Sequence, residues 1–201
     1  MGENPVSTLL PLSFKADRSY LHGSDFFQAI SKWATVTYGE SAYLCRLSFR
    51  RLARNRCMVV TEKPSDDELV GEGKISVSHG ETPFWLIEGH EPVTERRAFD
   101  EASITTGMAL REAERTAELS QINGAAIDEI IFVTKQLNCA VSPVVDGKWL
   151  FGQLQLDMPL LRGERPLRIV MRSLLANRFS VNDIYYGDEH VGNIRFIVGK
   201  P

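Results

Sequence analysis

Four consecutive residues, His22-Gly23-Ser24-Asp25, form the most suggestive cluster of reactive groups in this sequence. Apolar residues follow them at helical spacing, so the cluster is expected at the start of a helix. A histidine titrates near neutral pH and can remove a proton beside a carbonyl group, while free amides at a helix start can stabilise the resulting oxyanion. His22 is therefore a candidate base, and Gly23 and Ser24 are candidate substrate-binding residues. A helix-entry histidine capped by its neighbours is the structural alternative.

Three acidic residues occupy predicted helix starts and are candidate catalytic carboxylates. Asp25 opens the first predicted helix, and Asp100 and Glu101 open a second one predicted over residues 100–120. Acidic residues at this position also stabilise a helix by about 0.3–1 kcal/mol without any catalytic role. Both interpretations stay open for each of the three.

Arg46 and Arg50 share one face of a predicted strand, where they could bind a phosphate of a pantetheine carrier or of RNA. A salt-bridged solvent face is the alternative. His79 and His90 flank another predicted strand, but their spacing matches no metal-ligand motif, so we expect no metal site. The sequence contains no G-x-S-x-G elbow and no P-loop, and no cofactor is expected.

Composition indicates an ordinary globular protein of 201 residues with 43% apolar residues. A net charge of −3 and a pI near 5.9 disfavour nucleic acid as a partner without excluding it. The cysteines Cys45, Cys57 and Cys139 lie in apolar runs without CxxC spacing, which predicts core residues in a reducing compartment. With no apolar run long enough to span a membrane and no signal peptide in residues 1–7, we expect a cytoplasmic protein.

The same order of elements appears twice: a strand, one helix and about four strands. These two passes divide the chain into residues 1–91 and 92–201. The first contains a strand near residues 9–14, a helix over 24–39 and strands over 43–49, 57–60, 73–77 and 84–87. The second contains the helix over 100–120, strands over 130–137, 149–156 and 167–175, and a hairpin of 183–186 with 194–198.

One amphipathic helix for each four or five antiparallel strands favours an α+β fold in which a mainly antiparallel sheet wraps around two helices. This arrangement resembles tandem hot-dog units, as in the double hot-dog superfamily of acyl-thioester dehydratases and thioesterases. The resemblance implies a dehydratase- or thioesterase-like role, with an acyl thioester of CoA or of a carrier protein as partner.

The resemblance also implies roles for individual residues. His22 would be the base, and Asp100 the acid on the second helix. In thioesterases a carboxylate near a helix start directs a water, a role open to Asp25 or Glu101. The sequence departs from the dehydratase motifs, since His22 does not begin the family's HxxxGxxxxP stretch and Asp100 is followed by Ile104 where the family has Gln or His.

Two alternatives remain open from the sequence. Strand, helix, two strands, helix and strand also describe a ferredoxin-like fold, and Tyr20-Leu21-His22-Gly23 resembles RNA-processing proteins of CRISPR systems. The five arginines between Arg46 and Arg56 would then face RNA. The chain could also be a binding module without catalysis, such as a structural hot-dog partner, and the sequence is compatible with a monomer or a homodimer.

Overall fold

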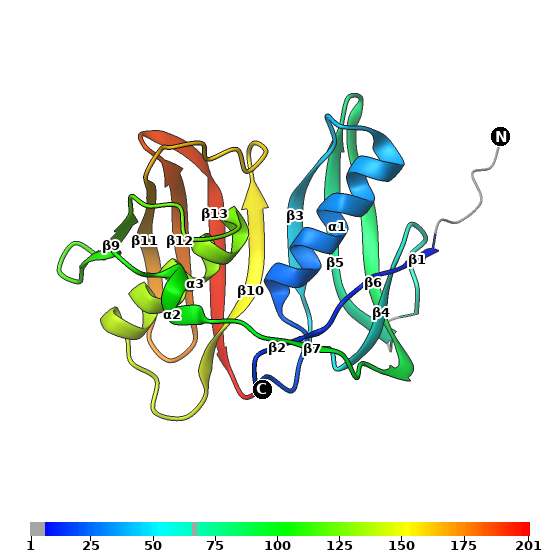
Figure 1. Ribbon diagram of the computed structural model, residues 1–201, viewed down its shortest axis with the longest axis horizontal. Coiled ribbons are helices and arrows are strands. Elements are labelled where there is room, and N and C mark those ends of the chain that lie inside the picture. Colours follow the sequence, from blue (N-terminus) through cyan, green and yellow to red (C-terminus); the bar gives the residue numbers. More distant parts are fainter. Residues whose placement is uncertain (1–6, 66–67) are drawn as a thin grey trace. The chain divides into compact units, whose positions relative to one another are not determined.

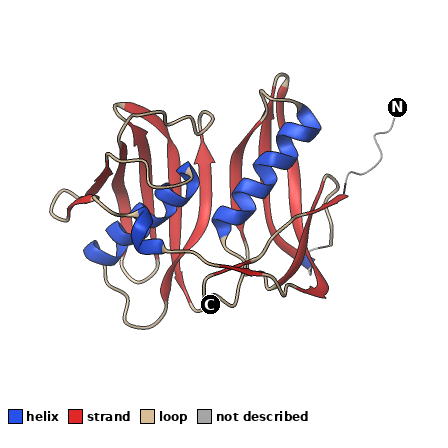
Figure 2. Cartoon of the chain, viewed as in Figure 1, coloured by secondary structure: helices blue, strands red, loops and turns tan. Residues whose placement is uncertain are grey.

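The protein, described here from a computed structural model, is a mainly antiparallel α+β protein (Figures 1 and 2). The structure describes residues 7–65 and 68–201. The expectation of no signal peptide concerns residues 1–7. Of these, residues 1–6 lie outside the described residues. Contacts divide the chain into two units, 1–99 and 100–201.

The first unit is a five-stranded antiparallel sheet with one long helix. Its strands follow the order β1-β4-β6-β5-β3. The bounds are β1 Ser7–Leu9, α1 Gly23–Tyr38, β3 Tyr43–Phe49, β4 Asn55–Val60, β5 Leu69–Val77 and β6 Gly80–Pro92. Two short strands, β2 Phe14–Lys15 and β7 Arg96–Arg97, form a separate parallel pair. The helix and strands predicted between residues 24 and 87 are therefore confirmed.

Helix α1 buries one apolar stripe against this sheet (Figure 1). The ring of Phe26 meets that of Phe49 edge-on at 5.3 Å between centroids, and Trp33 meets Phe84 at 6.0 Å. Each large side chain buried in this way contributes roughly 1.5–3 kcal/mol, which fixes the face that α1 turns to the sheet. The opposite, polar face carries residues such as Lys32 and Thr35 and is left to the solvent.

The second unit contains six strands in the order β10-β13-β12-β11-β9-β8, all antiparallel to their neighbours. Its elements are α2 Glu101–Ile104, β8 Ala109–Arg111, β9 Thr116–Leu119, α3 Ala126–Val141, β10 Lys148–Leu156, β11 Leu167–Leu175, β12 Phe179–Tyr186 and β13 Glu189–Gly199. Helix α3 contacts β9, β10, β11 and β12. The predicted strands after residue 148 and the closing hairpin are confirmed.

The helix predicted over residues 100–120 is wrong. Only the four residues of α2 are helical there, and β8 and β9 form a hairpin in the rest of the segment. Gly107 and Arg115 have positive φ angles of 76° and 53°, which a continuous right-handed helix does not allow. The apolar positions that suggested a helix belong in part to β9, where Ala117 and Leu119 are fully buried and alternate with more exposed neighbours.

The strand predicted over residues 130–137 is also wrong, because this segment lies within α3. An unbroken apolar run is compatible with a buried strand or a buried helix, and periodicity alone does not separate the two. The placement of Cys139 changes accordingly, since it lies on α3 and is exposed, whereas Cys45 and Cys57 are buried as predicted. The ferredoxin-like alternative finds no support in this strand order. No helix among the described residues has the length and apolar character needed to cross a membrane.

Candidate functional site

His22 is the residue that precedes α1, and its ring folds back over the helix start. The backbone is extended at His22 (φ −84°, ψ 140°), and Nδ1 accepts a hydrogen bond from the amide of Ser24 at 3.4 Å. The Ser24 hydroxyl oxygen lies 2.8 Å from the same nitrogen. With the His22 residue only 8% exposed, the ring is held in one orientation by two groups of the first turn.

Directly beside the ring lies a buried cluster of charged and polar groups. Lys15, which is fully buried, donates to the Ser24 hydroxyl at 2.7 Å and pairs with Asp25 Oδ1 at 3.3 Å. Arg97 binds the same Asp25 oxygen, and the Lys15 ammonium lies 4.0 Å from the centroid of the Phe99 ring. Arg97 is 42% exposed, whereas Lys15 and Asp25 are buried. Burial of these two charges is tolerable because they are paired, since an unpaired buried charge is strongly destabilising.

The parallel pair of β2 with β7 explains how residues distant in sequence meet at this cluster. Lys15 and Arg97 are directly opposite each other in the pair, and both reach Asp25 on the first turn of α1. No motif in the sequence indicated either cation, because a two-residue strand carries too little pattern to be recognised. Asp25 Oδ2 is buried and has no hydrogen-bond partner among the described residues.

The amides at the start of α1, predicted to stabilise an oxyanion, are partly occupied. The Ser24 amide binds the His22 ring, and the amides of Asp25 and Phe26 donate to the His22 carbonyl oxygen at 3.0 and 3.3 Å. Ser24 itself is fully buried. An oxyanion role at Gly23 and Ser24 would therefore have to use the remaining amide of Gly23, or displace the Ser24 amide from the ring.

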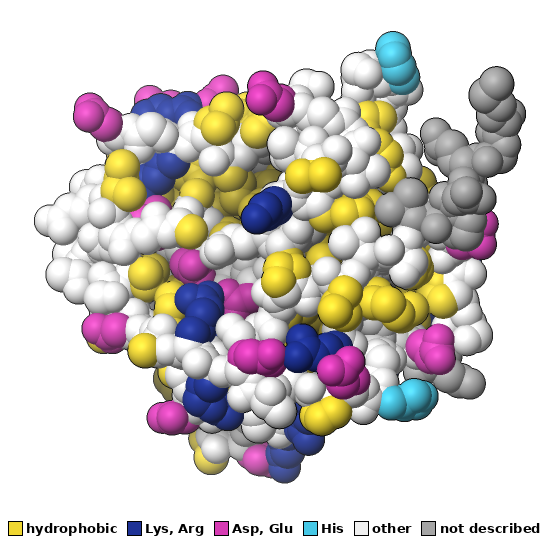
Figure 3. Space-filling view, turned by 45° about the vertical axis from the view of Figure 1, so that its right-hand side comes forward, with side chains coloured by type: hydrophobic (Ala, Val, Ile, Leu, Met, Phe, Trp, Pro, Cys, Tyr) yellow, Lys and Arg dark blue, Asp and Glu magenta, His cyan; other side chains and the backbone are white. Residues whose placement is uncertain are grey.

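Arg46 lies in the middle of β3 and Arg50 just after the strand, and both are exposed. Arg50 pairs with Glu72 of β5 at 3.3 Å, which is the salt-bridged solvent face that the sequence left as an alternative. Figure 3 shows basic and acidic side chains interspersed over the face that it draws, and no continuous basic stripe crosses the described part of that face.

Asp100 and Glu101 do not open a long helix. Asp100 is exposed and caps the four-residue α2, where its Oδ1 accepts from the amide of Ala102 at 3.0 Å. Glu101 pairs with Lys135 of α3 at 2.8 Å. The helix-start position for which these two residues were selected is instead occupied, on α3, by Asp128 and Glu129, both of which are buried.

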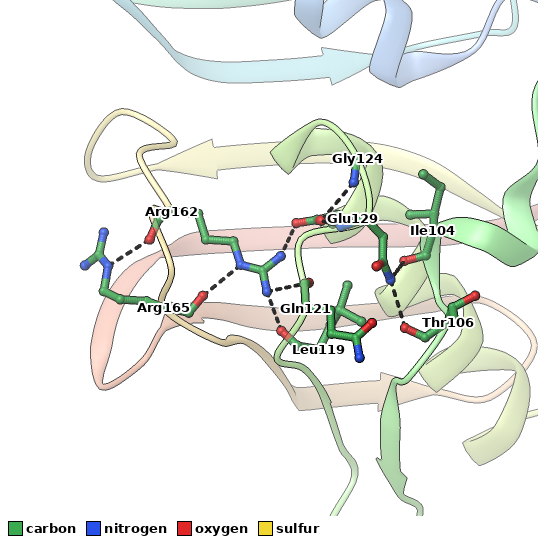
Figure 4. Close-up of polar contacts among 9 residues, drawn as sticks. Ile104, Thr106, Leu119, Gln121, Gly124, Glu129, Arg162 and Arg165 are labelled. Atoms are coloured by element: carbon green, nitrogen blue, oxygen red, sulfur yellow. Dashed lines mark hydrogen bonds and ion pairs between the residues drawn. The ribbon is translucent and has the colours of Figure 1, made fainter.

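Glu129 is the centre of a second buried cluster, which fixes the turn before α3 (Figure 4). Its Oε1 accepts from the amides of Asn123 and Gly124 at 2.6 and 3.1 Å, and its Oε2 pairs with Arg162. Arg162 also donates to the carbonyl oxygens of Leu119, Gln121 and Arg165. Arg162 thus joins the first turn of α3 to the segment that follows β9.

The thiols are poor nucleophiles in this environment. Burial raises the pKa of Cys57 to about 12, and it also raises the pKa of Cys45 above the ordinary value. Since the thiolate is the reactive form, these two buried cysteines stay protonated at neutral pH. The pKa of Cys139 is also raised, by partial desolvation of its thiol, although the residue as a whole is exposed. No group of three or more potential ligands among the described residues is arranged to hold a metal ion.

Comparison with known proteins identifies the fold. No protein-family model and no curated protein matches this sequence. The dehydratase domain of the polyketide protein PpsC from Mycobacterium tuberculosis is similar in structure, with a TM-score of 0.52 and 13% identity over 98% of this chain and 93% of that one. A second structure of the PpsC dehydratase domain, in complex with C12:1-CoA, gives 0.51 and 10% over 97% of this chain and 93% of that one. The chain therefore has the double hot-dog fold predicted from its order of elements.

Proposed function

We propose that this protein binds and processes an acyl thioester of CoA or of a carrier protein. The observation that carries the proposal is a buried histidine, His22, held in one orientation at the start of the helix that packs on the hot-dog sheet. The fold supports the proposal, because a similar fold in PpsC was solved with an acyl-CoA bound. Fold alone does not establish activity, so the proposal depends on the residues at this helix start.

Two reactions fit an acyl thioester and a histidine with a carboxylate. In hydrolysis, a water oxygen bonds to the carbonyl carbon, the C–S bond breaks, and the thiol leaves with a proton. In dehydration of a 3-hydroxyacyl thioester, the Cα–H and Cβ–O bonds break and water leaves. Both reactions place negative charge on the thioester oxygen, which a hydrogen-bond donor at a helix start would stabilise.

For the carboxylate we propose Asp25, which lies with His22 at the start of α1. Lys15 and Arg97 bind its Oδ1, whereas its Oδ2 is buried without a hydrogen-bond partner among the described residues. Asp25 is thus the candidate for directing a water to the thioester.

The test is turnover of acyl-CoA substrates by the purified protein. Release of free CoA measures hydrolysis, and the change in enoyl-thioester absorbance measures dehydration or its reverse. We expect His22→Ala to abolish turnover with the circular-dichroism spectrum unchanged, whereas His90→Ala, at an exposed position, keeps turnover. Full turnover in His22→Ala would remove this residue from the mechanism.

We propose that Arg46 and Arg50 contribute to binding through the phosphates of the thioester carrier. The double change Arg46→Ser with Arg50→Ser should then raise KM for acyl-CoA and leave kcat unchanged, because the phosphates lie far from the bond that reacts. An acyl-pantetheine substrate that lacks the nucleotide serves as the control, since its KM should respond less.

A second candidate is a hot-dog protein that binds an acyl thioester without converting it. The observation that favours it is the occupation of the Ser24, Asp25 and Phe26 amides by other groups of the helix start. Calorimetric binding of a non-hydrolysable acyl-CoA analogue without turnover of the matching thioester would support this candidate. Absence of both binding and turnover would reject both candidates.

A further inference from the structure

The sheet of the second unit has two faces of different character. Helix α3 packs on one of them, over buried residues such as Ile169 of β11 and Ile184 of β12. Successive side chains of a strand point to opposite faces, so the residues between these buried positions point away from α3. We call that side of β11, β12 and β13 the outer face. It carries Arg168, Leu175, Phe179, Tyr185, Arg195 and Ile197.

Two arginines of the outer face are supported by aromatic rings instead of carboxylates. The guanidinium carbon of Arg168 lies 4.4 Å from the centroid of the Tyr185 ring, and that of Arg195 lies 4.4 Å from the centroid of Phe179. Neither arginine forms an ion pair within the described part of the chain, whereas Arg51 of the first unit is paired with a glutamate. A stacked guanidinium is held in one orientation and keeps its N–H donors for an acceptor outside the protein.

An apolar row lies at one end of the same face. Leu175 of β11 is directly opposite Phe179 of β12, which in turn is directly opposite Ile197 of β13. Leu175 is 46% exposed and Ile197 is 40% exposed. Adjacent exposed apolar side chains of this kind, bordered by polar residues, mark an interaction surface.

Charge on the three strands of the outer face is predominantly positive. β11, β12 and β13 contain no lysine, and their two carboxylates, Asp183 and Glu189, are each paired with an arginine. The cations of Arg168 and Arg195 therefore stay without a counterion on these strands. Arginine and aromatic residues with few lysines and carboxylates are the composition found at the core of protein interfaces.

We propose that the outer face docks a partner protein through an acidic surface that also exposes apolar side chains. Carboxylates of the partner bind the stacked guanidinium groups of Arg168 and Arg195, which accept such groups in a bidentate manner. Apolar side chains of the partner cover Leu175 and Ile197. This docking goes beyond the proposed acyl-thioester function and uses no residue of the site at the start of α1.

Charge and stacking favour an acidic protein over two other occupants. In a two-fold contact with a second copy, the same positive face would lie opposite itself, which places like charges together. A single-stranded nucleic acid binds by stacking its bases on open aromatic rings, but guanidinium groups already lie on the rings of Tyr185 and Phe179. Two unpaired arginines are also few for tracking a phosphate backbone.

The probe for this surface is a synthetic peptide of glutamate and leucine with leucine at helical spacing. Titrated into ¹⁵N-labelled full-length protein, it should bind and shift amide signals of β11, β12 and β13. A matched peptide with lysine in place of glutamate should bind at least about tenfold more weakly, since it offers no carboxylate to the arginines.

Arginine variants test the residues that the proposal names. The double change Arg168→Ser with Arg195→Ser should weaken binding of the glutamate peptide by at least about tenfold, as for the loss of charge-assisted hydrogen bonds. The control is Arg54→Ser with Arg115→Ser, which removes the same charge at two exposed positions outside the outer face. It should keep the affinity within about twofold, and circular dichroism checks that both double variants are folded.

Several results would overturn the proposal. These are no binding of the glutamate peptide, equal binding of the lysine peptide, or equal loss in the two double variants. Binding of single-stranded RNA that is lost in the variant of Arg168 and Arg195 would assign the face to nucleic acid instead. A dimer in sedimentation that dissociates in the same variant would assign it to a second copy. Each of these results is independent of thioester turnover, so a failure of the proposed function is a separate outcome.

Discussion

The ion pair of Lys15 with Asp25 is the interaction on which the helix start most depends. Lys15 is fully buried and Asp25 nearly so, which makes the loss of one partner costly because the other charge stays inside the protein. We expect Asp25→Asn to lower the free energy of unfolding by about 3–5 kcal/mol. Urea denaturation followed by circular dichroism measures this change.

A matched pair on the surface supplies the control. Lys74 and Glu81 are separated by 2.7 Å, but both side chains are about half exposed, at 41% and 52%. Water screens such a pair, so Glu81→Gln should leave the unfolding curve close to that of the unmodified protein. Comparable effects of Asp25→Asn and Glu81→Gln would show that the buried pair is not the stabilising contact inferred here.

Through Glu88, the stability of the first unit should depend on pH in the acid range. Partial burial alone would raise the pKa of Glu88, but hydrogen bonds from the amides of Arg54 and Asn55 and the pair with Arg51 outweigh it, so that the pKa is lowered. The folded protein therefore holds the charged form more strongly than the unfolded chain, whose glutamate titrates at about 4.3. Its contribution is complete above about pH 4.3 and is lost as the pH falls through the lowered pKa.

This sign makes Glu88→Gln a pH-dependent substitution. We expect it to lower the free energy of unfolding by about 1.5–3 kcal/mol at neutral pH, as for hydrogen bonds to a charged group. The difference from the unmodified protein should shrink as the pH is lowered below about 4. Denaturation curves over this range measure it, with exposed Glu91→Gln as the control. A difference that grows toward acid would have the wrong sign.

At the scale of single elements, β5 depends on a glycine at one position. A Cβ atom on Gly73 would lie 2.2 Å from the Arg46 carbonyl oxygen and 2.5 Å from the ring of Phe84. Neither neighbour can retreat easily, because one is backbone and the other is a fully buried ring beneath Trp33. Gly73→Ala should therefore cost about 1–3 kcal/mol or more, measured by thermal unfolding.

Gly89 in β6 provides the comparison for Gly73. Its nearest neighbour to an added Cβ is the Arg56 carbonyl oxygen at 3.5 Å, an ordinary contact distance. Gly89→Ala should consequently be close to neutral. Equal melting temperatures of the two alanine variants would contradict the steric conflict expected at Gly73.

The turn before α3 depends on Arg162 in the same way that the start of α1 depends on Lys15. Arg162→Met leaves the buried Glu129 without its cation, and we expect a loss of about 3–5 kcal/mol in the free energy of unfolding. Arg111→Met is the matched control, because Arg111 is half exposed and 4.0 Å from Glu118. The control should change stability by less than about 1 kcal/mol. A small effect of Arg162→Met would show that the turn holds without this pair.

The elements that sequence reasoning recovered are those with a clear period. Apolar residues recur at every second position of β3, from Tyr43 to Phe49, and α1 carries one apolar stripe, so both elements follow from local pattern. α3 is buried over most of its circumference, which removes the amphipathic signal that marks a helix. The candidate site followed the same rule: His22 was found through the pattern of α1, whereas Lys15 was missed because the two-residue β2 carries no recognisable pattern.

For the molecule as a whole, the repeated order of elements concealed a difference in pairing. In the first unit the strand after the helix, β3, pairs with β5, the third strand to follow α1. In the second unit the strand after the helix, β10, pairs with β13, the fourth to follow α3. Chain order therefore predicted the fold class, but strand partners depend on long-range contacts that a single sequence does not reveal.

Charge at the scale of the whole chain separates the proposed function from RNA binding. The net charge is −3, and the arginines near residue 50 are paired, Arg50 with Glu72, Arg51 with Glu88 and Arg56 with Glu91 and Glu95. A protein that neutralises many phosphates needs a clear excess of cations and shows an affinity that falls steeply with salt. We expect the purified protein to carry no nucleic acid and to give no shift of single-stranded RNA at physiological salt.

The double arginine variant proposed for the acyl-CoA measurement also tests RNA binding. If RNA bound through the arginine face, the double change Arg46→Ser with Arg50→Ser would weaken RNA binding and flatten its salt dependence, because each lost phosphate contact reduces the slope by about one. RNA binding with a steep salt dependence in the unmodified protein would favour a binding module over a thioester enzyme.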